Sequence, residues 1–298
     1  MTELARTRTD SAAVLSMLAG AVMISTSAPW VKVAEVAPST SAFYRMAIGG
    51  VGLIILCLLQ RRTLWQGTRY ALRFVPVAIF FALDLYFWHR SIIYVGPGLA
   101  TILANFQVFV LAMVGWLVFK ERVPWTFFAG VLAAFAGIWL LVGVDWTQLG
   151  ETYRVGVVFG LLTAVAYSAF ILSMRQAQGA RRTLSTPANL GIMSLICAAI
   201  LAAVSWFEGH SFAVPNLKTW GALLAYGLFC QVIGWMLLTR AMPRLPAALV
   251  GLFLLLQPAL SFLWDILFFA RPTDRWDLVG AGLVLAGIYV ANRRQTDG

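Results

Sequence analysis

Ionisable side chains inside long apolar stretches are the first candidates for chemistry in this sequence. Asp84 is the acid that lies deepest within such a stretch. A charged side chain at the centre of a membrane helix costs ~2.5–3.5 kcal/mol on insertion scales, so it marks a candidate functional site. Asp84 either binds and releases protons during a functional cycle or is a protonated or paired structural carboxylate. Asp265 lies nearer a segment end and is expected to face water.

Three polar residues follow Asp84 on the same predicted helix. At 3.6 residues per turn, Tyr86, His89 and Arg90 fall within an arc of ~100°, and Asp84 points away from it. The helix therefore has two polar faces, and both cannot face lipid. His89 is expected either at the outer water interface or in a proton relay, because imidazole titrates near neutral pH.

Two cations lie on either side of Pro38. Lys32 and Arg45 together could hold a carboxylate, with the guanidinium binding in bidentate fashion. The alternative is that Arg45 secures a helix end or pairs with Glu35.

Uncharged amides and aromatic rings complete the candidate set. Gln107 and Gln257 occupy matching mid-helix places, where an amide binds a zwitterion or clamps helices together. Aromatic rings at this depth would stack on a planar or cationic ligand, although they also serve ordinary packing. The residues expected to line a cavity are Trp30, Lys32, Tyr44, Arg45, Asp84, Tyr86, Trp88, His89, Asn105, Gln107, Tyr167, Gln231, Trp235 and Gln257.

The sequence shows no signature of an enzyme, a cofactor or a metal site. It has no P-loop, no G-x-S-x-G elbow and no H-E-x-x-H helix. Cys57, Cys197 and Cys230 each fall inside an apolar run, and His89 and His210 lie on different segments. We expect neither catalysis nor a bound metal or cofactor. The basic residues are single or paired between apolar runs, a pattern typical of membrane topology signals rather than of nucleic-acid binding.

The composition predicts an all-α integral membrane protein in contact with the lipid bilayer. Hydrophobic residues make up 61% of the 298 residues and charged residues only 11%. A helix needs ~20 apolar residues to span the bilayer, and helix satisfies the backbone hydrogen bonds within one segment. Ten segments qualify: 12–32, 41–60, 71–90, 97–119, 125–144, 154–174, 188–207, 219–239, 246–269 and 276–292.

An internal repeat relates the two halves of the chain. The stretch 92–141 returns in altered form at 241–291, and the matching pairs are Pro97 and Pro246, Gln107 and Gln257, Gly130 and Gly280, and Gly137 and Gly287. Each half, 11–145 and 153–292, holds five predicted helices. Since five is odd, the second half must enter the membrane upside down relative to the first, as in transporters with inverted repeats.

Orientation and mobility follow from basic residues and prolines. Placing both termini in the cytoplasm puts most basic residues at the inner ends of the segments, as the positive-inside rule requires. We expect a multi-pass protein of the bacterial inner membrane, compatible with a monomer. Helices 1–4 and 6–9 are expected to line a central cavity, with hinges at Pro29 and Pro258.

Residues 24–47 resemble the opening of the EamA repeat in the drug/metabolite transporter superfamily. Lys32, Pro38 and Arg45 match the pattern, whereas Ile24 and Ser25 depart from its Trp-Gly. The run 120–122, followed by glycines, matches the end of the repeat. The resemblance implies two inverted five-helix EamA repeats around a central cavity and secondary transport of small molecules.

Within that superfamily, the chain looks most similar to YddG-type exporters of aromatic and other neutral amino acids. An amino-acid-like substrate is therefore the first expectation. Exporters of nucleobases, sugars or lipophilic drugs are the alternative within the superfamily. A membrane scaffold without transport, or an intramembrane enzyme, is the alternative from another class.

Overall fold

The computed structural model describes residues 11–118, 120, 125–143, 150–178, 184–245 and 247–292. Glu121 and Arg122, which carry part of the family resemblance, lie outside the described residues, as do the chain termini. Every described secondary-structure element is a helix, and these helices form ten spans that correspond to the ten predicted segments. Seven helical segments are long and apolar enough to cross a membrane, and two shorter apolar helices lie at Trp125–Leu141 and Phe253–Phe269.

The first half contributes spans 1 to 5. Span 1 consists of α1 (Ser11–Ser25) and α2 (Ser27–Val33), span 2 is α3 (Pro38–Leu59), and span 3 consists of α4 (Thr68–Leu72) and α5 (Phe74–Val95). Span 4 consists of α6 (Pro97–Ala104) and α7 (Gln107–Leu117), and span 5 of α8 (Trp125–Ile138) with the π-helix η1 (Trp139–Gly143).

The second half contributes spans 6 to 10. Span 6 is α9 (Glu151–Gln178), and span 7 is α10 (Thr186–Phe207). Span 8 consists of α11 (Leu217–Ala225), the π-helix η2 (Tyr226–Gly234) and α12 (Trp235–Ala241), followed by the short 3₁₀ turn η3 (Met242–Arg244). Span 9 is α13 (Ala247–Phe269), and span 10 is α14 (Arg275–Asn292).

Prolines and glycines set several helix boundaries. Proline occupies the first turn of α3, α6 and α10. It is tolerated there because a backbone N–H in the first turn has no acceptor within the helix. Gly96, with φ 89°, separates span 3 from span 4, because a left-handed residue ends the α5 hydrogen-bond pattern. The side chain of Asn216 accepts a hydrogen bond from Thr219 N and so caps α11.

Spans 1 and 4 are each interrupted near their middle. In span 1, α1 ends at Ser25 and α2 begins at Ser27. Pro29 has no N–H to offer the Ser25 carbonyl four residues earlier, which explains the break at this point. In span 4, α6 ends at Ala104 and α7 begins at Gln107. Span 9 instead continues as α-helix through Pro258. That Pro29 and Pro258 act as hinges stays a prediction.

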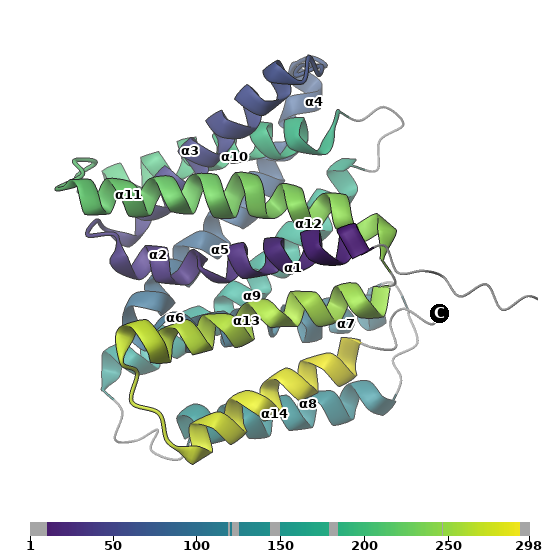
Figure 1. Ribbon diagram of the computed structural model, residues 1–298, viewed down its shortest axis with the longest axis vertical. Helices are drawn as coiled ribbons and strands as arrows, with labels where there is room; N and C mark the ends of the chain where they lie inside the picture. Colours follow the sequence, from purple (N-terminus) through teal and green to yellow (C-terminus); the bar gives the residue numbers. More distant parts are fainter. Residues whose placement is uncertain are drawn as a thin grey trace, which may run out of the picture.

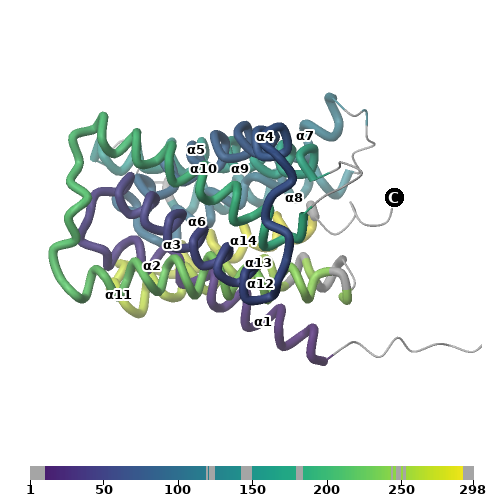
Figure 2. Tube along the Cα trace, turned by 90° about the horizontal axis from the view of Figure 1, so that it is seen from above, coloured from purple at the N-terminus to yellow at the C-terminus, as the bar shows by residue number. Residues whose placement is uncertain are grey.

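The two halves pack with a pseudo-two-fold arrangement. Three pairs of equivalent spans pack against each other: 2 with 7, 4 with 9, and 5 with 10. Span 3 packs against span 6, and their equivalents, spans 8 and 1, also pack against each other. Figure 1 shows the pair α8 and α14 as a separate layer beneath the other helices. Figure 2, turned by 90°, shows the helices running across the molecule in the same general direction.

Contacts between spans 5 and 10 show that the second half is inverted. A Cβ atom on Gly280 would lie 2.7 Å from the carbonyl oxygen of Gly137, and one on Gly287 would lie 2.5 Å from that of Gly130. The earlier glycine of each helix therefore meets the later glycine of the other, so α8 and α14 run antiparallel. We call these four glycines the glycine seam. The two-fold operation exchanges its two contacts, because Gly130 matches Gly280 and Gly137 matches Gly287.

Both described ends of the chain lie on one side of the bundle. The start of α1 and the end of α14 lie at the right in Figure 1, as expected after ten crossings, and we call this end of the bundle the terminal side. The opposite end is the far side. Large apolar side chains are exposed on the lateral surface, including Leu132 at 72% and Phe135 at 58%. Such apolar surface suits acyl chains of a bilayer, and the molecule is a multi-pass membrane protein.

The glycine seam makes a stability prediction. We expect Gly137→Ala to lower the melting temperature of the detergent-purified protein, because the added methyl group meets the Gly280 backbone and the helices must separate. Overpacking of this kind costs about 1–3 kcal/mol. The matched control is Gly282→Ala on α14, where a Cβ meets nothing within 4 Å. Equal melting temperatures for the two variants would contradict the close approach.

Candidate functional site

A central cavity lies where the spans are interrupted. Its volume is about 130 Å³, smaller than the ~300–1,000 Å³ of pockets for drug-sized ligands and suited to a small metabolite. The break in span 1 contributes Ser25 and Ser27, and the break in span 4 contributes Asn105 and Gln107. Irregular backbone at membrane depth is tolerated where it lines such a cavity, and transporters use it to bind substrate.

The lining residues come from both halves. Spans 1 to 4 supply Ile24, Ser25, Ser27, Ala28, Arg45, Phe81, Asp84, Trp88, Thr101, Ala104, Asn105 and Gln107, and spans 6, 8 and 9 supply Thr163, Tyr167, Trp235 and Gln257. Spans 5 and 10 contribute none of these described lining residues. Span 7 was expected to contribute and does not.

Arg45 is the buried cation of the cavity. Its side chain projects from α3, and only 6% of the residue is exposed. Its Nε donates a hydrogen bond to Gln231 Oε1 at 3.1 Å, and NH1 donates to the Tyr226 hydroxyl at 2.7 Å. The guanidinium also lies over aromatic rings, 4.7 Å from the Tyr226 centroid and 5.9 Å from that of Trp88. Both acceptors belong to the second half of the chain.

Asp84 is the buried carboxyl group of the same cavity. It projects from α5 and is 6% exposed, and Arg45 provides the opposite charge that acts on it. Among the described residues, no hydrogen bond or ion pair joins its carboxylate to another side chain. The cavity thus contains a guanidinium and a carboxyl group that are not bonded to each other.

Three further polar atoms of the lining have no partner among the described residues. Gln107 Oε1, an acceptor, Trp235 Nε1, a donor, and the Ser27 hydroxyl are buried without a hydrogen bond to any of them. A buried polar group without a partner costs about 1–3 kcal/mol, so a ligand that pairs with these atoms would recover that free energy. The first atom belongs to span 4, the second to span 8 and the third to span 1.

The structure brings eight predicted residues together in the cavity lining: Arg45, Asp84, Trp88, Asn105, Gln107, Tyr167, Trp235 and Gln257. It leaves six outside the lining: Trp30, Lys32, Tyr44, Tyr86, His89 and Gln231. Lys32 is exposed and does not accompany Arg45. The alternative pairing of Arg45 with Glu35 is wrong, because Glu35 binds Lys218 and Asn216. Trp30 Nε1 donates to Thr26, and the Tyr44 hydroxyl donates to the Phe212 carbonyl.

His89 is fully buried, which excludes the expected position at a water interface. Its Nδ1 lies 2.7 Å from the Leu85 carbonyl, and its Nε2 lies 3.4 Å from the Tyr226 hydroxyl. Tyr226 therefore connects His89 to Arg45, although the sequence analysis did not single it out. The available signal was a tyrosine inside the apolar segment 219–239.

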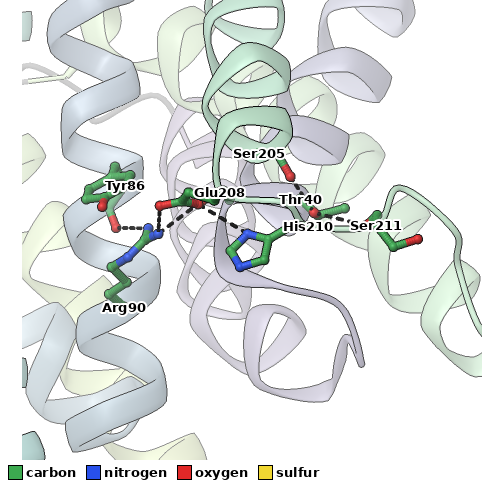
Figure 3. A network of polar contacts seen from close by, with 8 residues as sticks. Thr40, Tyr86, Arg90, Ser205, Glu208, His210 and Ser211 are labelled. Atoms are coloured by element: carbon green, nitrogen blue, oxygen red, sulfur yellow. Dashed lines mark hydrogen bonds and ion pairs between the residues drawn. The ribbon is translucent and has the colours of Figure 1, made fainter.

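A second polar network closes the far side (Figure 3). Arg90 forms an ion pair with Glu208, and its guanidinium lies 3.5 Å from the ring centroid of Tyr86. Ser39 donates a hydrogen bond to Glu208, and His210 Nδ1 lies 3.2 Å from the same carboxylate. This far-side network joins spans 2 and 3 of the first half to the end of span 7.

Asp265 caps the start of span 4 rather than facing water. It is 3% exposed, and its Oδ2 accepts a hydrogen bond from Gly98 N at 3.0 Å. Arg271 NH1 lies 3.6 Å from the same oxygen and also donates to the Val95 carbonyl. The expectation that Asp265 is solvent-facing is therefore wrong, and its role here is to hold span 4 against span 9.

The sequence profile of the EamA-like transporter family matches residues 11–143 and 154–293, one repeat for each half of this ten-span fold. The chain belongs to the EamA-like transporter family. It is accordingly a transporter and not an enzyme.

Similar proteins agree with this assignment. The chain is 26% identical to a pseudopaline exporter, CntI, of Pseudomonas aeruginosa over 84% of each chain. It is 21% identical to an uncharacterized transporter of Archaeoglobus fulgidus, over 87% of this chain and 90% of the other. A crystal structure of 20% sequence identity superimposes with a TM-score of 0.66, covering 95% of this chain and 99% of the other, which supports the fold alone.

The far-side network predicts a pH dependence of stability. Burial alone would raise the pKa of Glu208, but the hydrogen bond from Ser39 and the charge of Arg90 outweigh it and hold that pKa below 4.5. A carboxylate with a lowered folded-state pKa stabilises the protein above its ordinary pKa, and this contribution is lost as the pH falls through the lowered value. We expect the melting temperature to fall at acidic pH.

Glu208→Gln tests this linkage. We expect the variant to melt a few degrees lower at pH 7, at roughly 2–4 °C per kcal/mol lost, and to show a weaker acid dependence than the wild type. Glu35→Gln is the matched control, because the Glu35–Lys218 pair is exposed and such pairs contribute little. If the melting temperature of Glu208→Gln fell with pH as steeply as that of the wild type, Glu208 would not be the source of the acid dependence.

Proposed function

We propose that the protein is a secondary exporter of small zwitterionic metabolites, most closely of amino acids with aromatic or other neutral side chains, as in YddG-type exporters. The observation that supports this most directly is that the Arg45 guanidinium and the Asp84 carboxyl group line one small cavity without being bonded to each other. An α-amino acid has a carboxylate for the first and an ammonium group for the second. Trp88, Phe81 and Tyr167 offer ring faces for an apolar side chain.

The proposed transport mechanism is alternating access of the two inverted halves around the cavity. The far-side network holds one end together, so opening that end requires Arg90 and Glu208 to separate. The sequence has no P-loop for ATP, and we propose that a substrate or ion gradient drives transport. Export across the bacterial inner membrane, with both termini in the cytoplasm, agrees with the distribution of basic residues.

Relatives support export as the direction of transport. The relative from Pseudomonas aeruginosa is described as a pseudopaline exporter. The second candidate function is a carrier of nucleobases, sugars or lipophilic drugs, which is favoured by the aromatic lining and by the neutral amides of Asn105 and Gln107.

Flux measurements distinguish these functions. We expect protein-dependent efflux of labelled phenylalanine, threonine or methionine from loaded proteoliposomes. Arg45→Gln and Asp84→Asn should each lower this flux at least about tenfold, because each removes a charged partner worth ~1.5–3 kcal/mol per hydrogen bond. Asp277→Asn, at a half-buried position in the first turn of α14 and outside the cavity lining, is the control and should leave flux unchanged.

Absence of flux for every amino acid tested would remove the proposed function. Protection of cells against a toxic drug, lost in Asp84→Asn without any amino acid flux, would establish the second candidate instead.

A further inference from the structure

Two residues of span 8 contact Arg45 although their spacing would separate them on an ordinary helix. Tyr226 and Gln231 are five residues apart, which corresponds to ~140° around an α-helix of 3.6 residues per turn. Both lie in the π-helix η2, Tyr226–Gly234. The wider turn of a π-helix, with its i→i+5 hydrogen bonds, brings residues five apart close to one face. The Tyr226 hydroxyl and Gln231 Oε1 consequently accept from the same guanidinium.

Glycines allow span 8 to approach Arg45 this closely. Gly49 lies one turn after Arg45 on α3, and a Cβ there would collide with the side chain of Gln231. A Cβ on Gly227 of η2 would likewise collide with Ile48. The surfaces of spans 2 and 8 therefore fit together only with glycine at both positions, and this contact holds Gln231 against Arg45.

His89 fixes the direction of the hydrogen bond at Tyr226. The Leu85 carbonyl can only accept, so Nδ1 of His89 carries the proton that it shares with Leu85. In the neutral ring, Nε2 is then an acceptor and takes the Tyr226 O–H. The lone pairs of the Tyr226 oxygen remain for Arg45 NH1. Each hydrogen bond in this series has a defined donor: Arg45 donates to Tyr226, Tyr226 to His89, and His89 to Leu85.

This arrangement uses only part of the hydrogen-bonding capacity of Arg45. A guanidinium has five N–H donors in a planar fork, and the bonds to Gln231 and Tyr226 occupy one on Nε and one on NH1. Within the part of the chain that the structure describes, no residue accepts a hydrogen bond from NH2, and Arg45 lines the cavity. A guanidinium held at Nε and NH1 cannot rotate freely, so its remaining donors are pre-oriented for a planar anion.

We infer that the Arg45 guanidinium is a carboxylate subsite whose orientation is set by Tyr226 and Gln231, which act as positioning residues from the opposite half of the protein. This inference rests on the proposed function, because it requires a substrate with a carboxylate. It assigns the affinity for that carboxylate to the π-helix of span 8 as well as to Arg45. The ammonium group of the substrate is left to Asp84, which these residues do not touch.

The test compares one amino acid with its methyl ester, which lacks the carboxylate charge. The amino acid with the highest wild-type flux in proteoliposomes is used, and its ester is added as a competitor. We expect Tyr226→Phe to raise KM for the amino acid about tenfold with kcat nearly unchanged. The inhibition constant of the ester should stay the same, so discrimination between acid and ester shrinks. Gln231→Met should act in the same direction.

Tyr94→Phe is the matched control. Tyr94 is partly exposed on α5 and stacks against Phe159, away from the cavity lining. We expect its KM and its acid–ester discrimination to equal those of the wild type. Melting temperatures of all variants report whether each one folds, and a purely structural role of Tyr226 would lower the melting temperature and the amount of active protein without changing KM.

The outcomes separate the two proposals. No amino acid flux in the wild type overturns the proposed function, and this inference with it. Normal wild-type flux combined with an unchanged KM in both Tyr226→Phe and Gln231→Met overturns the inference alone. An equal rise in the KM of the amino acid and the inhibition constant of the ester also overturns the inference, because Tyr226 and Gln231 would then affect the cavity as a whole.

Discussion

The requirement that polar groups find partners inside the protein governs this structure, because hydrocarbon offers none. Some of the described polar side chains obey it locally: Ser25, Thr163 and Thr239 bond to carbonyls of their own helices. Several buried polar atoms have no partner among the described residues, and those of Ser27, Gln107 and Trp235 line the cavity. A ligand bound in the cavity could satisfy these three.

Both polar centres join the two halves of the chain. Arg45 of the first half is held by Tyr226 and Gln231 of the second, and Arg90 of the first half by Glu208 of the second. Neither half contains a complete site. Relative movement of the halves would change the surroundings of both arginines, so the proposed binding of a ligand at Arg45 would be coupled to the far-side network.

Hydropathy and the repeat predicted much of the fold, because span length and glycine positions are local properties of the sequence. The same reasoning expected Arg45, Asp84, Gln107 and Gln257 in a cavity, since mid-span polar residues have few alternatives, and all four line the cavity described here. It failed where contacts between distant parts of the chain determine the surroundings of a side chain. Lys32 is close to Arg45 in sequence, but the turn at Pro38 sends the two side chains to different surroundings. Tyr226 was missed because a π-helix leaves no periodicity that a 3.6-residue pattern would detect.

The glycine seam also bears on how such a chain arises. Its two contacts, Gly137 with Gly280 and Gly130 with Gly287, are exchanged by the two-fold operation. This is the geometry of an isologous interface, the kind that two identical subunits form. A polypeptide of five helices, inserted in both orientations, would present the same glycines to its own copy. The covalent link between the halves thus fixes two five-helix units in opposite orientations, an arrangement that the self-complementary glycine surface already favours.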